Sequence, residues 1–321
     1  MRVLVTGGCG FIGSNFVRYM LKEHPDYKIT NLDKLTYAGN PDNLKDLESN
    51  PNYEFVKGDI CDASLAAELI PGHDAIINFA AESHVDRSIT NPDEFVLTNV
   101  VGVNNMINTA RLNGVDRFIQ IGTDEVYGSR ETGDFKEDDK LEPSSAYSAS
   151  KAGGDLVALS YYTTHNYDVM VTRSSNNFGP YQYPEKLIPL FVTNVLEDKS
   201  VPVYGDGRNQ RDWLYVEDNC RGIDAVLHNG KAGEIYNIGA GNQQENIDIT
   251  KWVLEALGKS EDLITYVDDR LGHDFRYAID VNKMKELGWQ PDEDFKKSLS
   301  RTIDWYKENT EWWQKIKNHK E

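Results

Sequence analysis

A tyrosine and a lysine lie four residues apart, at Tyr147 and Lys151, where an apolar helix is expected to begin. Residues four apart in a helix lie on one face, one turn from each other. A lysine ammonium beside a phenol favours the phenolate by opposite-charge attraction, so it would move a phenol pKa of about 10 toward the working range of a general base. We interpret Tyr147 as a candidate proton acceptor, although this spacing alone also occurs on helices that carry no chemistry.

Two adjacent carboxyls, Asp124 and Glu125, follow Thr123 just after the apolar run at residues 118–121. Open α/β sheets bind their ligands at the carboxyl ends of the strands, which is where these side chains are expected. An acid and a base would then stand beside the phenol. Neighbours in a regular strand point to opposite faces, so the chain must turn at this point for both carboxyls to reach one substrate. The alternative is an ordinary solvated loop.

A glycine-rich turn separates a β-branched run at residues 3–6 from an apolar-periodic segment at residues 11–21, and it reads Gly7-Gly8-Cys9-Gly10-Phe11-Ile12-Gly13. Glycines between a strand and a helix let the backbone approach a pyrophosphate, which rests on the helix N-terminus. Asp33 lies about 20 residues after Gly13, where a carboxylate that accepts from the ribose 2′-hydroxyl is expected. We therefore predict NAD rather than NADP as the cofactor, and the neighbouring Lys34 weakens this preference because a lysine tolerates a 2′-phosphate.

The composition limits the classes of partner. The net charge of −18 argues against non-specific binding to nucleic acid or to an anionic membrane. The three cysteines are scattered at Cys9, Cys61 and Cys220, so they suggest neither a disulfide framework nor a metal site. No apolar run reaches the roughly 18 residues of a membrane span, and no signal peptide is visible. We expect a cytoplasmic protein that has no metal and binds neither nucleic acid nor membrane.

Strand and helix patterns alternate over the first half of the chain. Strand candidates are residues 3–6, 29–32, 53–56, 75–79, 118–122 and 169–172, and helical patterns cover residues 11–21, 63–70, 92–112 and the segment that opens at Tyr147. Such alternation indicates a parallel sheet. We predict an α/β fold: a Rossmann-type doubly wound parallel sheet with a smaller mixed α/β substrate-binding lobe.

The pattern changes after residue 177, where turn-rich polar segments are expected to connect short elements. We predict a NAD-binding domain over residues 1–177, which takes back one later strand near residues 235–238, and a nucleotide-sugar-binding lobe over residues 178–321. Loops of this lobe carry Arg208, Arg211, Arg270 and Arg276. Arginine forks suit phosphate oxygens, so one or two of the four are candidate ligands for an anionic substrate. The tail at residues 295–317 is expected to be one amphipathic packing helix.

With these residues in place, the chain resembles the extended short-chain dehydrogenase/reductases, and within them the dTDP-glucose 4,6-dehydratase family. The broad marks are the glycine turn, Asp59-Ile60, and Tyr147 with Lys151. The narrow marks are residues 33–40, 80–86, Thr123-Asp124-Glu125, residues 184–189 and residues 272–277. Asp124 discriminates best, since related epimerases generally lack the Asp-Glu pair and related dehydratases and decarboxylases tend to carry Ser-Glu there.

The resemblance implies a set of site residues. The catalytic residues are Thr123, Asp124, Glu125, Tyr147 and Lys151. The NAD-contacting residues are Gly7, Gly10, Phe11, Ile12, Gly13, Asp33, Lys34, Leu35, Thr36, Asp59, Ile60, Ala80, Ala81, Ser83, Thr98, Tyr147, Lys151 and Asn177. The residues that hold the dTDP-sugar are Ser83, Thr123, Asn176, Lys186, Leu187, Arg211, Asn246, His273 and Tyr277.

Two departures from the family pattern stand out. Cys9 occupies a position that is commonly alanine, so a thiol near the pyrophosphate turn is expected to make the cofactor site sensitive to oxidants. Leu271 replaces a usual proline before Gly272-His273, which is expected to loosen a loop that touches the nucleotide.

The implied reaction is the dehydration of dTDP-glucose to dTDP-4-keto-6-deoxyglucose, as in deoxysugar (dTDP-rhamnose) biosynthesis. It proceeds through transient oxidation at C4, loss of water across C5 and C6, and hydride return to C6. Two alternatives stay open: a nucleotide-sugar 4-epimerase or decarboxylase on the same scaffold, and a non-catalytic NAD-binding regulatory protein. The residues do not decide between thymine and uracil. A homodimer through the helices of the 92–112 and Tyr147 segments is implied by the resemblance alone.

Overall fold

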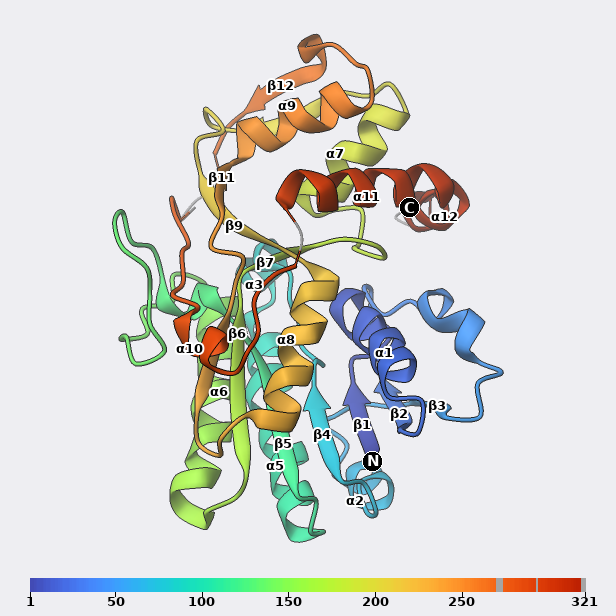
Figure 1. Ribbon diagram of the computed structural model, residues 1–321, viewed down its shortest axis with the longest axis vertical. Coiled ribbons are helices and arrows are strands. Elements are labelled where there is room, and N and C mark those ends of the chain that lie inside the picture. The colour runs from blue at the N-terminus through green and yellow to red at the C-terminus, as the bar shows by residue number, and fades with distance from the viewer. Residues whose placement is uncertain (270–273, 293, 319–321) are drawn as a thin grey trace.

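A seven-stranded sheet forms the centre of the computed structural model, which describes residues 1–269, 274–292 and 294–318. The strands follow the order β10-β6-β5-β4-β1-β2-β3, and each neighbouring pair is parallel. They are β1 (Arg2–Thr6), β2 (Lys28–Asp33), β3 (Tyr53–Lys57), β4 (Ala75–Asn78), β5 (Arg117–Thr123), β6 (Val169–Ser174) and β10 (Ile235–Ile238). The strand order reverses between β1 and β4, as in a doubly wound fold. The predicted fold class is confirmed (Figure 1).

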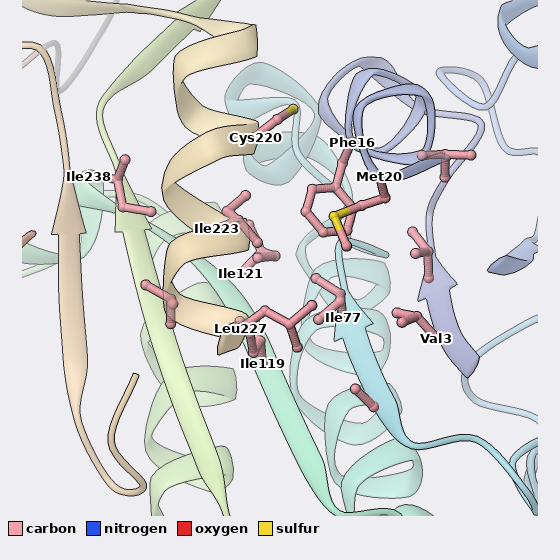
Figure 2. Packing of buried hydrophobic residues seen from close by; sticks show 14 of the residues in the cluster. Val3, Phe16, Met20, Ile77, Ile119, Ile121, Cys220, Ile223, Leu227 and Ile238 are labelled. Atoms are coloured by element: carbon pink, nitrogen blue, oxygen red, sulfur yellow. The ribbon is translucent and has the colours of Figure 1, made fainter. Parts of the chain in front are cut away.

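Helices cover both faces of this sheet. Side chains alternate along a strand, so Val3 and Val5 pack on one face and Leu4 on the other. The first face lies under α1 (Phe11–Glu23) and α8 (Val216–Asn229). Figure 2 shows this cluster, in which side chains of α1 and α8 meet those of β1, β4 and β5. The second face lies under α2 (Ala63–Leu69), α5 (Val103–Leu112) and α6 (Ala146–His165).

Three helices contradict the expectation of short elements and polar loops between residue 177 and the tail helix. They are α7 (Leu187–Leu196), α8 and α9 (Asn246–Ala256). In α8, Cys220, Ile223 and Leu227 recur at helical spacing and are buried against the central sheet. The three acidic residues of this helix interrupt its apolar pattern, so the segment looks like a loop in the sequence. The structure therefore places α8 with β10 on the first sheet rather than in a separate lobe, and the division at residue 177 stays a prediction.

A smaller group of elements lies above the central sheet in Figure 1. It contains a three-stranded sheet of β11 (Gln243–Glu245), β9 (Gln210–Tyr215) and β7 (Asn176–Phe178), and a parallel pair of β12 (Ile264–Val267) and β8 (Val201–Tyr204). A separate apolar cluster, which includes Phe178, Phe191 and Trp213, joins these strands to α7, α9 and α11 (Phe295–Glu308). The prediction of a mixed α/β group beside the main sheet is thus confirmed.

Of two long helices expected from the sequence, one is continuous and the other is interrupted. Residues 92–112 are helical throughout and form α4 (Pro92–Val96), a π-helical stretch η2 (Leu97–Gly102) and α5. The tail divides at Asn309 into α11 and α12 (Thr310–Asn318). The Asn309 side chain donates to the carbonyl oxygen of Trp305 at 2.9 Å, a local hydrogen bond that competes with helix continuation. Within the described ranges, no helix has both the length and the apolar character that crossing a membrane requires.

Candidate active site

A cavity opens at the carboxyl ends of the parallel strands, beside the point where the strand order reverses. Its walls come from segments far apart in the sequence, because each strand of the sheet ends at this same edge. Most of the predicted site residues line it. They are Gly7, Gly10, Phe11, Ile12, Gly13, Asp33, Lys34, Thr36, Asp59, Ile60, Ala80, Ala81, Ser83, Thr98, Thr123, Asp124, Glu125, Tyr147, Lys151, Asn176, Asn177 and Lys186.

The glycine turn leaves no room for side chains. Gly7 has a φ of 70°, and a Cβ atom there would lie 2.7 Å from the backbone nitrogen of Ala80. A Cβ atom on Gly13 would lie 2.3 Å from the carbonyl oxygen of Gly7. Gly10 precedes α1 without a side-chain cap, so the first N–H groups of this helix have no side-chain acceptor there. The turn therefore presents backbone donors and a positive helix end to the cavity.

Asp33 ends β2 with its carboxylate fixed by the backbone. One oxygen accepts the N–H of Cys9 at 2.8 Å and the other accepts the N–H of Leu35 at 2.8 Å. Burial raises the pKa of Asp33, and the two backbone hydrogen bonds lower it. Each carboxylate oxygen retains acceptor capacity for a ribose hydroxyl. Leu35 itself is not among the lining residues, and the ammonium of Lys34 lies 2.9 Å from a carboxylate oxygen of Asp59.

The expected sensitivity of Cys9 to oxidants is not supported. The side chain is 1% exposed, and burial with the nearby Asp33 raises the pKa of its thiol to about 12. A thiol is attacked by oxidants as the thiolate, so a buried thiol with a raised pKa is inert.

The chain turns directly after Thr123, as two carboxyls aimed at one substrate require. β5 ends there, and a 3₁₀ helix, η3 (Asp124–Tyr127), begins. The Thr123 hydroxyl accepts the N–H of Glu125 at 3.4 Å and so caps this short helix. Asp124 and Glu125 both line the cavity as a result.

The surroundings of Asp124 favour the protonated form of its carboxyl. Its side chain is 4% exposed, and no group in the described ranges forms a hydrogen bond with its Oδ2 atom. Burial raises the pKa of Asp124 well above its usual range, and the neighbouring Glu125 and Asp212 raise it further. A carboxyl that keeps its proton near neutral pH can act as a general acid.

Tyr147 and Lys151 lie in the first turns of α6, which begins in a capping box between Ser145 and Ser148. Burial and the charge of Glu125 raise the pKa of Tyr147, whereas a hydrogen bond with Thr123 lowers it. The structure thus shows no fall in the phenol pKa of the kind the spacing suggested. Lys151 instead donates to the carbonyl oxygen of Ile121 at 2.5 Å.

Lys151 is almost fully buried, and charges behind it affect its ionisation. Burial lowers the pKa of Lys151, and the carboxylate of Asp155 raises it. Asp155 forms an ion pair with Arg173 at 3.0 Å, and both side chains are no more than 1% exposed. This buried pair fixes the helix that carries the ammonium.

Besides Leu35, five predicted residues lie outside the cavity lining or outside the described ranges. Arg211 donates to the carbonyl oxygens of Asp274 and Phe275 at 2.8 and 3.1 Å. Its guanidinium lies over the ring of Tyr277, whose pKa is raised by burial and by Glu125. Leu187 begins α7, and His273 is outside the described residues. Asn246 begins α9, and its buried Oδ1 atom has no hydrogen-bond partner among the residues that the structure describes.

The four loop arginines do not form one basic cluster in the described part of the chain. Arg208 lies 3.6 Å from the exposed Asp206, and Arg276 pairs with Asp134 at 3.0 Å. Arg211 is buried behind the site, and Arg270 lies outside the described residues, as does Leu271.

One wall of the cavity was not assigned from the sequence. It includes Tyr37, Gln182, Tyr183 and Glu185. The Arg87 guanidinium lies over the Tyr37 ring, 3.6 Å from its centre. Tyr37 and Glu185 belong to segments typical of the family. Gln182 and Tyr183 lie outside these segments, and only the folded chain shows that they line the cavity.

Comparisons with known proteins agree with this geometry. The model of the GDP-mannose 4,6 dehydratase family matches residues 4–302. The low-salt glycan biosynthesis protein Agl12 of Haloferax volcanii is 53% identical over 306 residues, which cover 95% of this chain and 98% of that protein. A dTDP-glucose 4,6-dehydratase of Streptomyces niveus is 49% identical, over 99% of this chain and 96% of its own.

A solved structure is similarly close. The DesIV double mutant, a dTDP-glucose 4,6-dehydratase from Streptomyces venezuelae with NAD and DAU bound, superposes with a TM-score of 0.96 at 50% identity, covering 98% of this chain and 100% of that one.

Proposed function

The chain belongs to the dTDP-glucose 4,6-dehydratase family, and from this premise we propose that it converts dTDP-glucose to dTDP-4-keto-6-deoxyglucose on a tightly bound NAD. One observation carries the proposal: Thr123, Asp124 and Glu125 turn into the same cavity as Tyr147, beside the glycine turn. That cavity combines a dinucleotide site with separate groups for oxidation and for elimination.

The residues of the site fit NAD. The turn at Gly7 and Gly13 is a cradle that a Cβ atom would fill, and the fixed carboxylate of Asp33 suits ribose hydroxyls. Lys34 is paired with Asp59, which leaves it less suited to a 2′-phosphate. Asn177 contributes a buried Oδ1 atom that has no hydrogen-bond partner in the described ranges. When bound, NAD supplies a reversible acceptor for the C4 hydride of the sugar, which it later returns to C6.

Oxidation at C4 is assigned to Tyr147, Thr123 and Lys151. Tyr147 removes the proton of the C4 hydroxyl, and Thr123 holds the same oxygen. The phenol needs a nearby positive charge for this step, because burial and Glu125 raise its pKa. The Lys151 ammonium supplies positive charge one helical turn away.

Elimination is assigned to the two carboxyls. The C4 ketone makes the C5 hydrogen acidic, and Glu125 removes it. Asp124, held protonated, donates to the C6 hydroxyl, which leaves as water. Glu125 then returns its proton to C5 as C6 is reduced. A proton passed from Tyr147 to Asp124 through solvent restores both groups, so the net change is the loss of one water.

Substrate binding is assigned to Lys186 and Asn176 in the cavity wall, with Arg211, Asn246 and Tyr277 nearby. Lys186 places a cation beside the sugar end of the cavity, where a diphosphate needs one. Arg211 and Tyr277 stack together behind Glu125 and orient that wall. We assign the role of holding the nucleotide to residues 178–321.

The related epimerase and decarboxylase reactions need the tyrosine and lysine but no acid for a C6 hydroxyl. The position of Asp124 in the cavity, where burial raises its pKa, therefore favours the dehydratase. Turnover of dTDP-glucose tests the proposal, since a 4-keto-6-deoxy product absorbs in the ultraviolet after alkali treatment. A 4-epimer or a pentose product would contradict it.

We also propose a homodimer and a cytoplasmic location. Large apolar side chains are exposed side by side on α4, η2 and α6, at Val96, Leu97, Val101 and Leu156. An apolar patch of this kind on helices is typical of an interface between two copies of a chain. The three cysteines are all unpaired, as is usual in a reducing compartment.

A further inference from the structure

The C-terminal helix α12 reaches the cofactor turn through two hydrogen bonds. The indole Nε1 of Trp312 donates to Asn43 Oδ1 at 2.9 Å. Asn43 Nδ2 then donates to the carbonyl oxygen of Cys9 at 2.9 Å. Cys9 is part of the glycine turn, and its N–H donates to Asp33 at 2.8 Å. A side chain near the end of the chain is thus linked to both the pyrophosphate turn and the expected ribose ligand.

The preceding helix α11 holds the opposite wall of the cavity. The Tyr306 hydroxyl donates to the carbonyl oxygen of Gln182 at 2.5 Å, and Gln182 Nε2 donates to the carbonyl oxygen of Asn177 at 2.9 Å. Gln182 and Asn177 both line the cavity. Tyr181 packs against Trp305, with ring centres 4.7 Å apart. The two C-terminal helices therefore contact both sides of the cofactor site.

We infer that α11 and α12 form a clasp that slows the release of NAD, with Trp312 as its positioning residue. The reaction requires slow release, because the hydride taken from C4 must return to C6 of the same sugar. If the cofactor left between these steps, the keto sugar could not be reduced at C6. Widening the site requires the Trp312–Asn43 link to break or move. The inference rests on the proposed NAD site and adds to it the part of the chain that controls cofactor exchange.

The polar link, rather than aromatic packing alone, carries this effect. Asn43 is 1% exposed and uses both ends of its amide, one toward Trp312 and one toward Cys9. Without the indole N–H, its Oδ1 atom loses its donor and the amide is free to rotate away from Cys9. The neighbouring ion pair of Lys315 with Asp42 is largely exposed and contributes little.

The test compares Trp312→Phe with Trp305→Phe in the full-length protein. Trp312→Phe keeps a ring but removes the donor to Asn43. Trp305→Phe makes the same substitution at a second tryptophan, whose ring packs against that of Trp312. The indole N–H of Trp305 makes no hydrogen bond among the described residues. Each protein is first loaded with NADH, and the fluorescence of the bound NADH is recorded. A large excess of NAD is then added, and the decay of this fluorescence gives the release rate.

We expect Trp312→Phe to release NADH about threefold to tenfold faster than the original protein, the effect of one net hydrogen bond, and Trp305→Phe to stay within twofold. At saturating NAD the two variants should turn over alike, whereas after dilution without added NAD the Trp312→Phe variant should lose activity sooner. An unchanged release rate in Trp312→Phe, or an equal acceleration in both variants, would overturn the clasp. Failure of the original protein to bind NADH would instead overturn the NAD site itself.

Discussion

Replacing Asp124 by asparagine separates the two halves of the proposed reaction. Asp124 is 4% exposed, and burial together with the charges of Glu125 and Asp212 raises its pKa, which favours the protonated acid. Asparagine has nearly the same shape and no charge, but it cannot donate a proton to a leaving hydroxyl. Tyr147 and Thr123, which serve the oxidation, keep their positions.

The expected loss follows from the role. General acid catalysis typically contributes about 10²- to 10⁴-fold, so overall turnover should fall by that factor while C4 oxidation stays near its original rate. A loss of this size corresponds to about 3 to 5 kcal/mol in the activation free energy. Turnover of the original enzyme should decline as pH rises through the raised pKa of Asp124, because the acid form is then lost.

The raised pKa of Asp124 also makes the stability of the folded protein depend on pH. A carboxyl whose pKa is higher in the folded state contributes stability at low pH that is lost as pH rises through the folded pKa. The Asp124→Asn variant has no carboxyl at this position, so it does not lose this stability as pH rises. The free energy of unfolding of the variant relative to the original chain should therefore increase with pH, as measured by urea unfolding at several pH values.

The assay is single-turnover absorbance at 340 nm with NAD-loaded enzyme and dTDP-glucose. In the variant, the signal of reduced cofactor should appear at a rate near that of the original enzyme and persist. If Asp124→Asn bound substrate normally but never reduced the cofactor, the assignment of Asp124 to elimination would be wrong.

Three further substitutions test other parts of the account. Gly13→Ala places a Cβ atom 2.3 Å from the carbonyl oxygen of Gly7, so NAD binding measured by calorimetry should weaken about tenfold to a hundredfold. Asp155→Asn leaves the buried Arg173 without its anion and should lower the free energy of unfolding by about 3 to 5 kcal/mol in urea. Val101→Glu puts a charge into the exposed apolar patch and should shift the sedimenting species from dimer to monomer.

Matched controls separate these effects from general damage. Asp168→Asn breaks the partly exposed pair with Arg117 and should cost about 1 kcal/mol or less, so an equal cost at both pairs would contradict the buried-pair argument. Tyr266→Glu changes a residue that is 59% exposed on β12 and should leave the dimer intact. A Val101→Glu variant that stays dimeric would exclude the helical interface. Unaltered NAD affinity in Gly13→Ala would exclude the glycine cradle.

Local sequence was sufficient for the parts of the site that depend on backbone geometry. The glycine turn, Asp33 at the end of β2 and the turn after Thr123 each follow from steric or hydrogen-bonding needs of a few adjacent residues. The parallel sheet followed from the alternation of strand and helix patterns along the first half of the chain. These features are encoded over short stretches, so they are readable before the chain folds.

The features that were missed depend on contacts between distant segments. Burial and acidic neighbours, which only the folded chain supplies, reverse the expected fall in the Tyr147 pKa. Arg211 is buried against the carbonyl oxygens of residues 274 and 275, about sixty positions away, although it looks like a free loop cation in the sequence. The helical character of α8 is hidden in the sequence because acidic residues interrupt its apolar spacing, and it becomes evident where its apolar side packs on the central sheet. In each case, contacts that exist only in the folded chain set the property that the sequence did not predict.

The central claim is that one bound nicotinamide carries a hydride from C4 to C6 of the same sugar. The most direct measurement uses dTDP-glucose with deuterium at C4 and locates the label in the product by NMR. We expect deuterium in the C6 methyl group, retained even when unlabelled NAD is present in the solution. Absence of deuterium from C6, with the label lost to solvent or to free cofactor, would show that the hydride does not pass from C4 to C6.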